Sequence, residues 1–379
     1  MEKEIIVMGD IEMGAGNLTD DFISDRALSQ LIHQLARRKH PLDLVLNGDI
    51  LDFLKCPVVQ DGKFTYPRHI TAEISLEKLH LMHKAHLRVF EALKAFAGSA
   101  TYHHIYFVIG NHDHDLFFPQ VRAELKRLLG NKHTLHFPGL KYDSQGVYVE
   151  HGQQYDFLHR INFKNLFVHY KGRSLLNFPW TSFGLISTFM DMKERHPFLE
   201  RISPRPLLFS LHRMVLRKVS LRSLSYFLKS VLYYPFRYYS DPTYTFPRQM
   251  FGEFYRRLKE KDWEVDNVVD IFRKRKRGRL HRKISVLGHV HKTYVHEHQG
   301  SAVINPGTWR DEYQLEGKTR MLVPKKKHYV DIWIKGDQVQ YTLKEVSIPR
   351  SVFLFDQVVK DEVGYLLLAA QEEGFYLQS

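Results

Sequence analysis

Short apolar runs alternate with longer stretches of helical periodicity over most of the chain. The apolar runs predict strands at 4–9, 43–47, 104–109, 146–150, 283–287 and 301–304, and a β-hairpin over 328–346. Leucines at three- and four-residue steps predict helix over 72–98, and a further helix is expected over 20–39. This alternation indicates an α/β protein built in layers.

The pattern changes after residue 154. Residues 155–279 are expected to form a basic, aromatic and mainly helical insertion, in which 207–232 has the apolar and cationic spacing of an amphipathic helix. The strand signal returns afterwards, so the predicted core is discontinuous, 1–154 and 280–348. Residues 349–379 form a C-terminal extension, expected as an edge strand or a helix.

Composition narrows the protein class. The chain has 379 residues and one cysteine, Cys56, which excludes an internal disulfide and a cysteine-rich zinc site and fits a reducing compartment. The first residues lead directly into a strand without a signal-peptide pattern, and no run of about 18 uncharged apolar residues is present. We therefore expect a soluble, cytoplasmic protein.

The positive charge is uneven. Of the net charge of +13, the segment from Tyr155 to Met250 carries +10, from 15 Lys/Arg and 5 Asp/Glu. A basic segment of this size is typical either of a solvated basic face or of a contact with an anionic partner, such as phosphate-rich lipid, nucleic acid or an anionic substrate.

Metal-ligating residue types follow the predicted strands. The clusters are Gly48-Asp49-Ile50-Leu51-Asp52, Gly110-Asn111-His112-Asp113, His151-Gly152 and Gly288-His289-Val290-His291. Asp10 and Glu12 stand two residues apart after the first strand, as His289 and His291 do near a later one, so each pair could face one site. Carboxylate, amide and imidazole ligands gathered in this way indicate a site for two divalent metal ions.

These clusters, in this order, resemble the calcineurin-like metallophosphoesterase family over about 1–154 and 280–346. The resemblance implies a four-layer αββα sandwich and hydrolysis of a phosphomonoester, phosphodiester or pyrophosphate by a metal-bound hydroxide. It implies that Asp10 and His291 hold one metal, that Asn111, His151 and His289 hold the other, and that Asp49 bridges them. His112 would be catalytic, protonating the leaving oxygen or steadying the phosphoryl charge. We expect Asp113 to hold His112 by a hydrogen bond.

Glu12 departs from the family pattern, because it stands where a histidine ligand is expected. We predict that it ligates through oxygen, which favours harder ions. The expected cofactors are therefore two divalent ions, Mn²⁺ first, with Fe²⁺, Zn²⁺ or Mg²⁺ as alternatives. Asp52 is expected to orient other residues or brace its loop rather than touch metal.

The insertion is expected to select the substrate, because it follows His151 directly. One hypothesis is a UDP-sugar-lipid pyrophosphatase at the inner membrane surface, similar to the UDP-2,3-diacylglucosamine pyrophosphatase branch, with lipid contact through 155–250. A second is a nuclease or nucleotide phosphodiesterase, whose aromatics stack bases. A third is a non-catalytic scaffold, against which the intact motifs argue. The natural substrate and the oligomeric state stay open.

Overall fold

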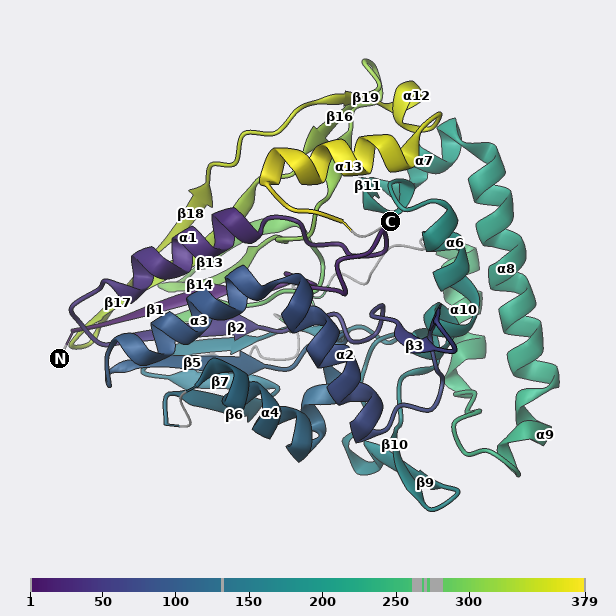
Figure 1. The fold of residues 1–379 in the computed structure, drawn as a ribbon, viewed down its shortest axis with the longest axis horizontal. Coiled ribbons are helices and arrows are strands. Elements are labelled where there is room, and N and C mark those ends of the chain that lie inside the picture. The colour runs from purple at the N-terminus through teal and green to yellow at the C-terminus, as the bar shows by residue number, and fades with distance from the viewer. Residues whose placement is uncertain (1, 131–132, 261–267, 269–270, 273–281, 378–379) are drawn as a thin grey trace.

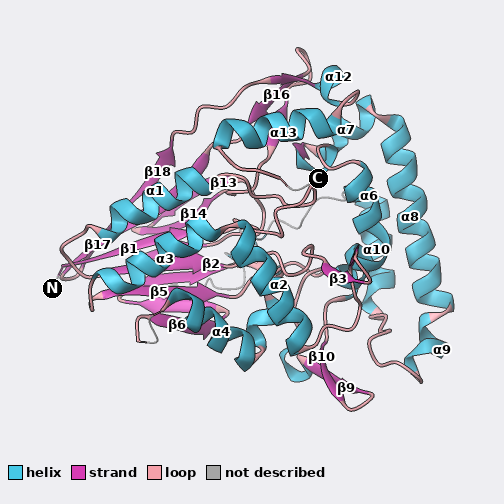
Figure 2. Ribbon diagram, in the orientation of Figure 1, coloured by secondary structure: helices cyan, strands magenta, loops and turns pink. Residues whose placement is uncertain are grey.

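Two β-sheets stacked face to face form the centre of the computed structural model, which describes residues 2–130, 133–260, 268, 271–272 and 282–377 (Figures 1 and 2). The larger sheet has the order β18-β17-β1-β2-β5-β6. Its strands are β1 (Glu2–Met8), β2 (Leu42–Asn47), β5 (His103–Val108), β6 (Leu135–Gly139), β17 (Lys327–Lys335) and β18 (Gln338–Val346). β1, β2, β5 and β6 run parallel, and β17 closes antiparallel on β1. Parallel strands end at one edge of the sheet, and loops from that edge can therefore meet.

The second sheet has the order β13-β14-β12-β8-β7. Its strands are β7 (Lys141–Ser144), β8 (Val147–Glu150), β12 (Ile284–Val286), β13 (Thr293–His298) and β14 (Ser301–Pro306). Alternate residues of the larger sheet, such as Ile5 and Val7, pack against Val149, Val286 and Ile304 of this one. The intervening residues of β1 point to the opposite face, so both faces of the strand are buried.

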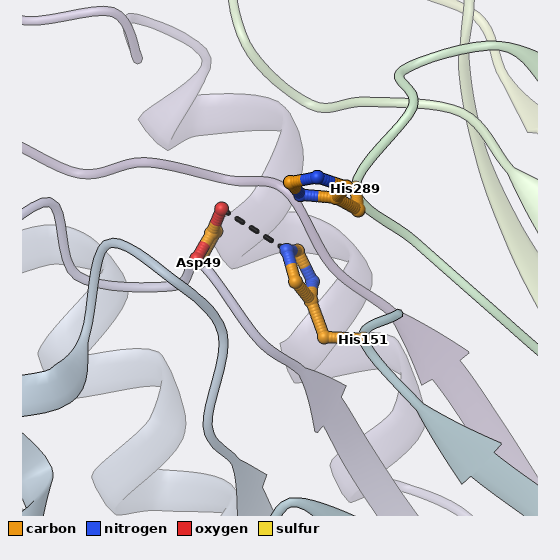
Figure 3. Close-up of side chains that lie close together, drawn as sticks. All are labelled: Asp49, His151 and His289. Atoms are coloured by element: carbon orange, nitrogen blue, oxygen red, sulfur yellow. Dashed lines mark ion pairs between the residues drawn. The ribbon is translucent and has the colours of Figure 1, made fainter. Parts of the chain in front are cut away.

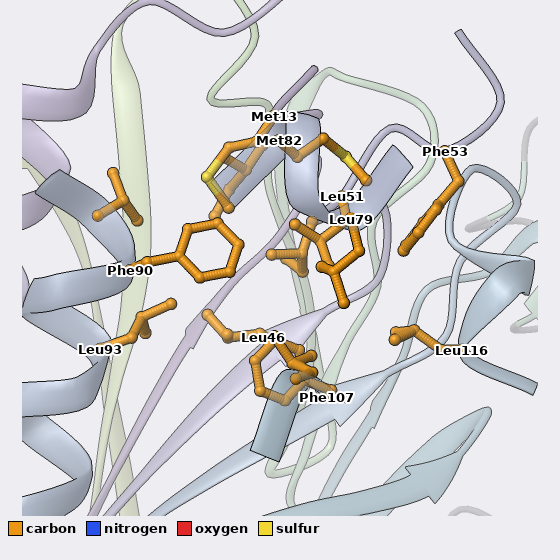
Figure 4. Packing of buried hydrophobic residues seen from close by; sticks show 14 of the residues in the cluster. Met13, Leu46, Leu51, Phe53, Leu79, Met82, Phe90, Leu93, Phe107 and Leu116 are labelled. Carbon is orange, nitrogen blue, oxygen red and sulfur yellow. The ribbon is translucent and has the colours of Figure 1, made fainter. Parts of the chain in front are cut away.

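Helices cover the other face of the larger sheet. They are α1 (Asp25–Ala36), α2 (Ala72–Ala85), α3 (Leu87–Ser99) and α4 (Pro119–Leu129). Figure 4 shows Leu46 and Phe107 of the sheet packed against Leu79 and Phe90 of these helices. The helical layer and the paired sheets confirm the layered α/β architecture. The periodicity over 72–98 continues across a break at His86, whose side chain bonds Asp20 and Asp25 on neighbouring segments.

The insertion lies beyond the carboxyl ends of the strands (Figure 1). Its helices are α5 (Trp180–Gly184), continued by a π-helical turn (Leu185–Phe189), α6 (Met190–Arg195), α7 (Arg205–Leu211), α8 (Arg213–Leu232), α9 (Tyr234–Tyr238) and α10 (Gln249–Glu260). The helix expected over 207–232 is thus two helices, separated at His212. The insertion also contains a hairpin that the sequence analysis did not predict, β9 (Phe167–Tyr170) with β10 (Arg173–Leu176). The expected end of the insertion, at 279, lies outside the described residues.

Small sheets complete the fold. β3 (Val58–Gln60) and β4 (Lys63–Thr65) flank the tight turn at Asp61-Gly62. A four-stranded sheet joins the insertion, the core and the extension in the order β11-β15-β16-β19, with bounds Ile202–Ser203, Tyr313–Leu315, Met321–Pro324 and Phe353–Leu354. The extension continues as α12 (Phe355–Val358) and α13 (Glu362–Glu373). It therefore contains both an edge strand and helices, which were the two alternatives expected for it. No helix among the described residues has the length and apolar character needed to cross a membrane.

Candidate metal centre

The motif residues meet at the carboxyl edge of the two sheets. Asp10 follows β1, Asp49 follows β2, Asn111 follows β5, His151 follows β8 and His289 follows β12. Backbone bonds join the first two loops: the amides of Ile11 and Glu12 donate to the carbonyl of Asp49 at 2.9 and 2.8 Å. Segments distant in sequence therefore present their side chains to one place.

The backbone of these loops is unusual. Asp10, Glu12, Asp49, His289 and His291 all have positive φ, between 50° and 72°. Residues with a Cβ adopt this region rarely and at a cost, and such residues concentrate at functional sites. His289 and His291 lie in a loop after Val286 rather than on a strand, so left-handed turns, and not the strand alternation we expected, orient their side chains.

One group of ligand atoms comes from Asp49, His151 and His289 (Figure 3). One ligand atom of each lies within 4.8 Å of the others, and the side chains are buried. His151 Nε2 is 3.1 Å from Asp49 Oδ2 and 3.3 Å from Asn111 Oδ1. His151 Nδ1 donates to the carbonyl of Asn47 at 2.9 Å, which leaves Nε2 as the ligating nitrogen.

A second group surrounds His291. Its Nε2 is 3.2 Å from Asp10 Oδ1 and 3.5 Å from Glu12 Oε1. Its Nδ1 donates to Glu312 Oε1 at 2.7 Å. A carboxylate behind a histidine fixes the ring and strengthens the other nitrogen as a ligand. The sequence analysis missed Glu312, which carries no motif signal.

Two glycines allow the ligands to approach the backbone. A Cβ on Gly110 would lie 2.1 Å from Asp49 Oδ1, and one on Gly288 would lie 2.7 Å from Asp10 Oδ2. Any larger residue at either position would displace a predicted ligand.

Glu12 stands between the ligand group and a buried cationic cluster. Its Oε2 accepts a bond from Lys55 Nζ at 2.5 Å and lies 3.4 Å from Arg310 Nε, whereas its Oε1 faces His291. Lys55 also pairs with Asp21 and Asp52. One carboxylate oxygen is therefore held by cations, and the other remains directed to the site.

His112 is oriented by Asp52. Asp52 Oδ1 lies 2.8 Å from His112 Nδ1, and Asp49 Oδ1 accepts the backbone N–H of His112 at 2.8 Å. Burial opposes the charged imidazole, but the carboxylates of Asp52, Glu12 and Asp49 outweigh it and raise the pKa of His112 to about 9. Asp52 is thus placed to orient the ring. The side chains of Glu12, Asp52 and His112 also lie close enough together to hold a metal ion.

The hydrogen bond predicted between Asp113 and His112 is not the one formed. The carboxylate of Asp113 instead accepts the backbone amides of Gly110 and Ile50, at 2.5 and 3.1 Å. Burial and the charge of Asp49 raise the pKa of Asp113 to about 7. Asp113 therefore joins two motif loops, and the Nδ1 atom of His112 is bonded to Asp52 instead.

The insertion adds two residues that the motifs did not indicate, Asp156 and His159. Asp156 Oδ2 lies 3.0 Å from His289 Nε2 and 2.7 Å from His159 Nδ1. Burial lowers the pKa of His289 to about 4, whereas neighbouring carboxylates raise the pKa of His151 to about 10 and that of His291 to about 9. The only signal for this pair is its position five and eight residues after His151.

The donor set fits divalent metal ions. Carboxylate oxygens, one amide oxygen and imidazole nitrogens converge from five loops, and the Nδ1 atoms of His151 and His291 are already bonded. This mixture of hard oxygen and imidazole ligands suits Mn²⁺, Fe²⁺ or Zn²⁺.

A cavity of about 400 Å³ lies in the insertion, between residues 157–163, 179–181 and 247–250. Most of its wall is apolar, and Arg160 adds a cation to it. The apolar lining includes Phe157, Leu158, Ile161, Phe163, Trp180 and Met250.

A family model described as calcineurin-like phosphoesterase matches residues 3–246. No curated protein matches the chain. Among solved structures, a protein described as a 5′-nucleotidase of Staphylococcus aureus, in complex with α-ketoglutarate, is 12% identical with a TM-score of 0.32. The alignment covers 97% of this chain and 59% of that one. A phosphopantetheinyl hydrolase of Mycobacterium tuberculosis is 13% identical with a TM-score of 0.29, over 81% of this chain and 90% of that one.

Proposed function

The chain belongs to the calcineurin-like phosphoesterase family, and from this premise we propose that it is a metal-dependent phosphoric ester hydrolase that works through a pair of divalent ions. Asp10, Glu12 and His291 would hold one ion, Asn111, His151 and His289 the other, and Asp49 would bridge. The observation that carries the proposal is the convergence of these ligand atoms around His151 and His291. When bound, such ions supply a water nucleophile at neutral pH and neutralise phosphoryl charge.

The protein's own residues would complete the reaction. His112, held by Asp52, would donate a proton to the leaving oxygen. Asp113 would keep the Gly110 and Ile50 loops in register. Asp156 would fix the ring of His289.

The apolar cavity supports a substrate that has an apolar or aromatic group next to its phosphate. Its aromatic and aliphatic wall can take such a group, and Arg160 can contact an anionic oxygen. This favours an amphipathic phosphoester, such as a lipid-linked one, over a small hydrophilic phosphomonoester.

Metal content tests the proposed centre. We expect wild-type protein stripped with EDTA and reloaded with Mn²⁺ to hold two ions per chain by inductively coupled plasma mass spectrometry, and to hydrolyse bis-p-nitrophenyl phosphate. Asn111→Ala and Glu12→Ala should each lose about one ion and most turnover. The fold should survive loss of Glu12, because Lys55 and Arg310 keep other carboxylate partners.

The matched control is Glu4→Ala. Glu4 is also a buried carboxylate, but it lies at the start of β1 and pairs with His40. This variant should lower Tm and keep both ions. A single ion in the wild type would contradict the paired centre, and unchanged metal content in Glu12→Ala would contradict ligation by Glu12.

A further inference from the structure

Helix α8 is apolar on two opposite faces. One face packs into the insertion through Val215, Tyr226 and Ser230. The other carries Leu221, Leu224 and Leu228, at three- and four-residue steps, and these are 57%, 50% and 47% exposed. A single soluble chain rarely leaves such a row of leucines in water, so the exposed face indicates a contact.

The apolar surface continues past the end of α8. Leu232 is 67% exposed, and Phe236 and Tyr239 of the α9 segment are 75% and 91% exposed. α8 and α9 together form the outer edge of the molecule (Figure 1). Aromatic side chains of this kind prefer the boundary between water and lipid. We call the exposed residues of α8 and α9 the α8 face.

The charge of the α8 face has one sign. No Asp or Glu occurs between Glu200 and Asp241, whereas this stretch contains eight Lys or Arg. Arg213, Arg217 and Lys229 are exposed and form no ion pair with a carboxylate of the described residues. Cations beside exposed leucines on one helix complement a surface that has anionic groups on the outside and an apolar layer beneath them.

A hollow at the junction of α7 and α8 is lined by both cationic and apolar side chains. It measures about 460 Å³. Its lining residues are Pro206, Phe209 and Ser210 of α7 with Arg213, Leu216 and Arg217 of α8. Two arginines and several apolar side chains in one lining match a lipid phosphate and the chain attached to it.

We propose that the α8 face docks the protein on a bilayer that contains anionic phospholipid. The contact would be peripheral, with the leucines at the acyl boundary and the arginines among the phosphates. The inner side of α8 contacts the cavity wall, because Trp180, which lines that cavity, donates to Ser230 Oγ at 2.8 Å and its carbonyl accepts the hydroxyl of Tyr226. The docking goes beyond the proposed hydrolysis and does not depend on it.

Co-sedimentation with vesicles tests the docking. Wild-type protein should sediment with vesicles of phosphatidylcholine and phosphatidylglycerol, sediment far less with phosphatidylcholine alone, and be released by salt. Arg213→Ala/Arg217→Ala should lower the partition coefficient about 30-fold, from the contribution of two arginines near an anionic surface. Leu224→Ser/Leu228→Ser should lower it about tenfold without changing charge.

The matched control is Leu367→Ser/Leu368→Ser on α13, where the two leucines are 38% and 43% exposed. It should bind vesicles like the wild type. Each variant should keep the wild-type Tm and the wild-type turnover of bis-p-nitrophenyl phosphate, so lost binding cannot be ascribed to misfolding. Equal binding to both vesicle types would overturn the role of anionic lipid.

Absence of vesicle binding would overturn the proposal. So would a wild-type dimer in size-exclusion chromatography that the Leu224→Ser/Leu228→Ser variant converts to monomer without any loss of vesicle binding, because the face would then belong to a second copy of the chain. Vesicle binding needs no hydrolysis, so an inactive but vesicle-binding protein would contradict the proposed function alone.

Discussion

At the scale of single residues, the centre uses one device repeatedly: a histidine is fixed through Nδ1 so that Nε2 is presented. The Nδ1 partner is the Asn47 carbonyl for His151, Glu312 for His291 and Asp52 for His112. A bonded Nδ1 selects the tautomer and the ring orientation in advance. The three imidazole rings are thus all held through a hydrogen bond at Nδ1. Their proposed roles differ because the Nε2 atom of each ring faces a different neighbour.

Asp52→Asn separates proton donation from metal binding. The amide is nearly isosteric but cannot stabilise a charged imidazole, so we expect kcat with bis-p-nitrophenyl phosphate to fall about 10²-fold. Metal content should remain that of the wild type, because the bonds of Asp52 go to His112 and Lys55. Loss of an ion together with kcat would show that Asp52 is a ligand.

At the scale of elements, the strands end where the ligands begin, and glycine makes room between them. In Gly110→Ala the new Cβ would meet both Oδ1 and the backbone nitrogen of Asp49, at 2.1 and 2.5 Å. We expect this variant to bind less Mn²⁺ and to lose about 1–3 kcal/mol of unfolding free energy. Mass spectrometry and denaturant titration measure the two effects.

Gly98→Ala is the matched control. Gly98 lies in α3, and a Cβ there meets no atom within 4 Å. It should raise the unfolding free energy by about 0.5 kcal/mol through helix propensity and leave metal content unchanged. If Gly110→Ala retained full metal content, the close approach of Asp49 to the backbone would not matter to the centre.

The sequence was sufficient for the elements that carry local patterns. The predicted strand 43–47 and the predicted hairpin 328–346 agree within a residue or so with β2 and with β17–β18. Both could be predicted because neighbouring residues carry the signal, as a continuous apolar run for the strand and as a tight turn for the hairpin. The breaks at His86 and His212 were missed, because leucine spacing continues across both of them. At His212 the ring accepts the amide of Val215, and at His86 the ring bonds Asp20 and Asp25 on other segments, and neither contact shows in the spacing.

The supporting residues of the site could not be predicted for a related reason. Asp156 meets His289 across 133 positions, and Lys55 meets Glu12 across 43. No local period relates such partners, and only the packing of the insertion and loops brings them together. The ligand motifs could be found because each one follows a predicted strand. The residues that form hydrogen bonds with the ligands do not follow a predicted strand.

At the scale of the whole molecule, one buried imidazole joins three parts of the chain. His86 bonds Asp20, in the loop after the first motif, and Asp25 of α1, at 2.9 Å each. Its ring stacks on Phe375 of the C-terminal extension, with centroids 5.1 Å apart. Asp20 in turn accepts the amides of Gly14, Gly16 and Phe22. The charge of His86 therefore supports the loop behind Glu12 and the attachment of the extension.

The pH dependence of stability follows from this arrangement. Burial alone would lower the pKa of His86, but Asp25 and Asp20 outweigh it and raise the pKa to about 10. The unfolded value is about 6.5. A raised folded pKa gives stabilisation that is fully present below the unfolded pKa and is lost as pH rises through the folded one. The contribution of His86 should thus be largest at about pH 6 and decline towards pH 10.

His86→Gln tests this directly. At about pH 6 we expect the variant to lose about 3–5 kcal/mol of unfolding free energy, because two buried carboxylates lose their cation. The gap in Tm between wild type and variant, followed by circular dichroism at steps up to about pH 9.5, should narrow as the wild-type imidazolium titrates. His33→Gln, at an exposed position on α1, should leave Tm unchanged throughout. A gap that stays constant or widens with pH would mean that His86 stabilises the fold as a neutral ring, by packing on Phe375, and not as a charge between two aspartates.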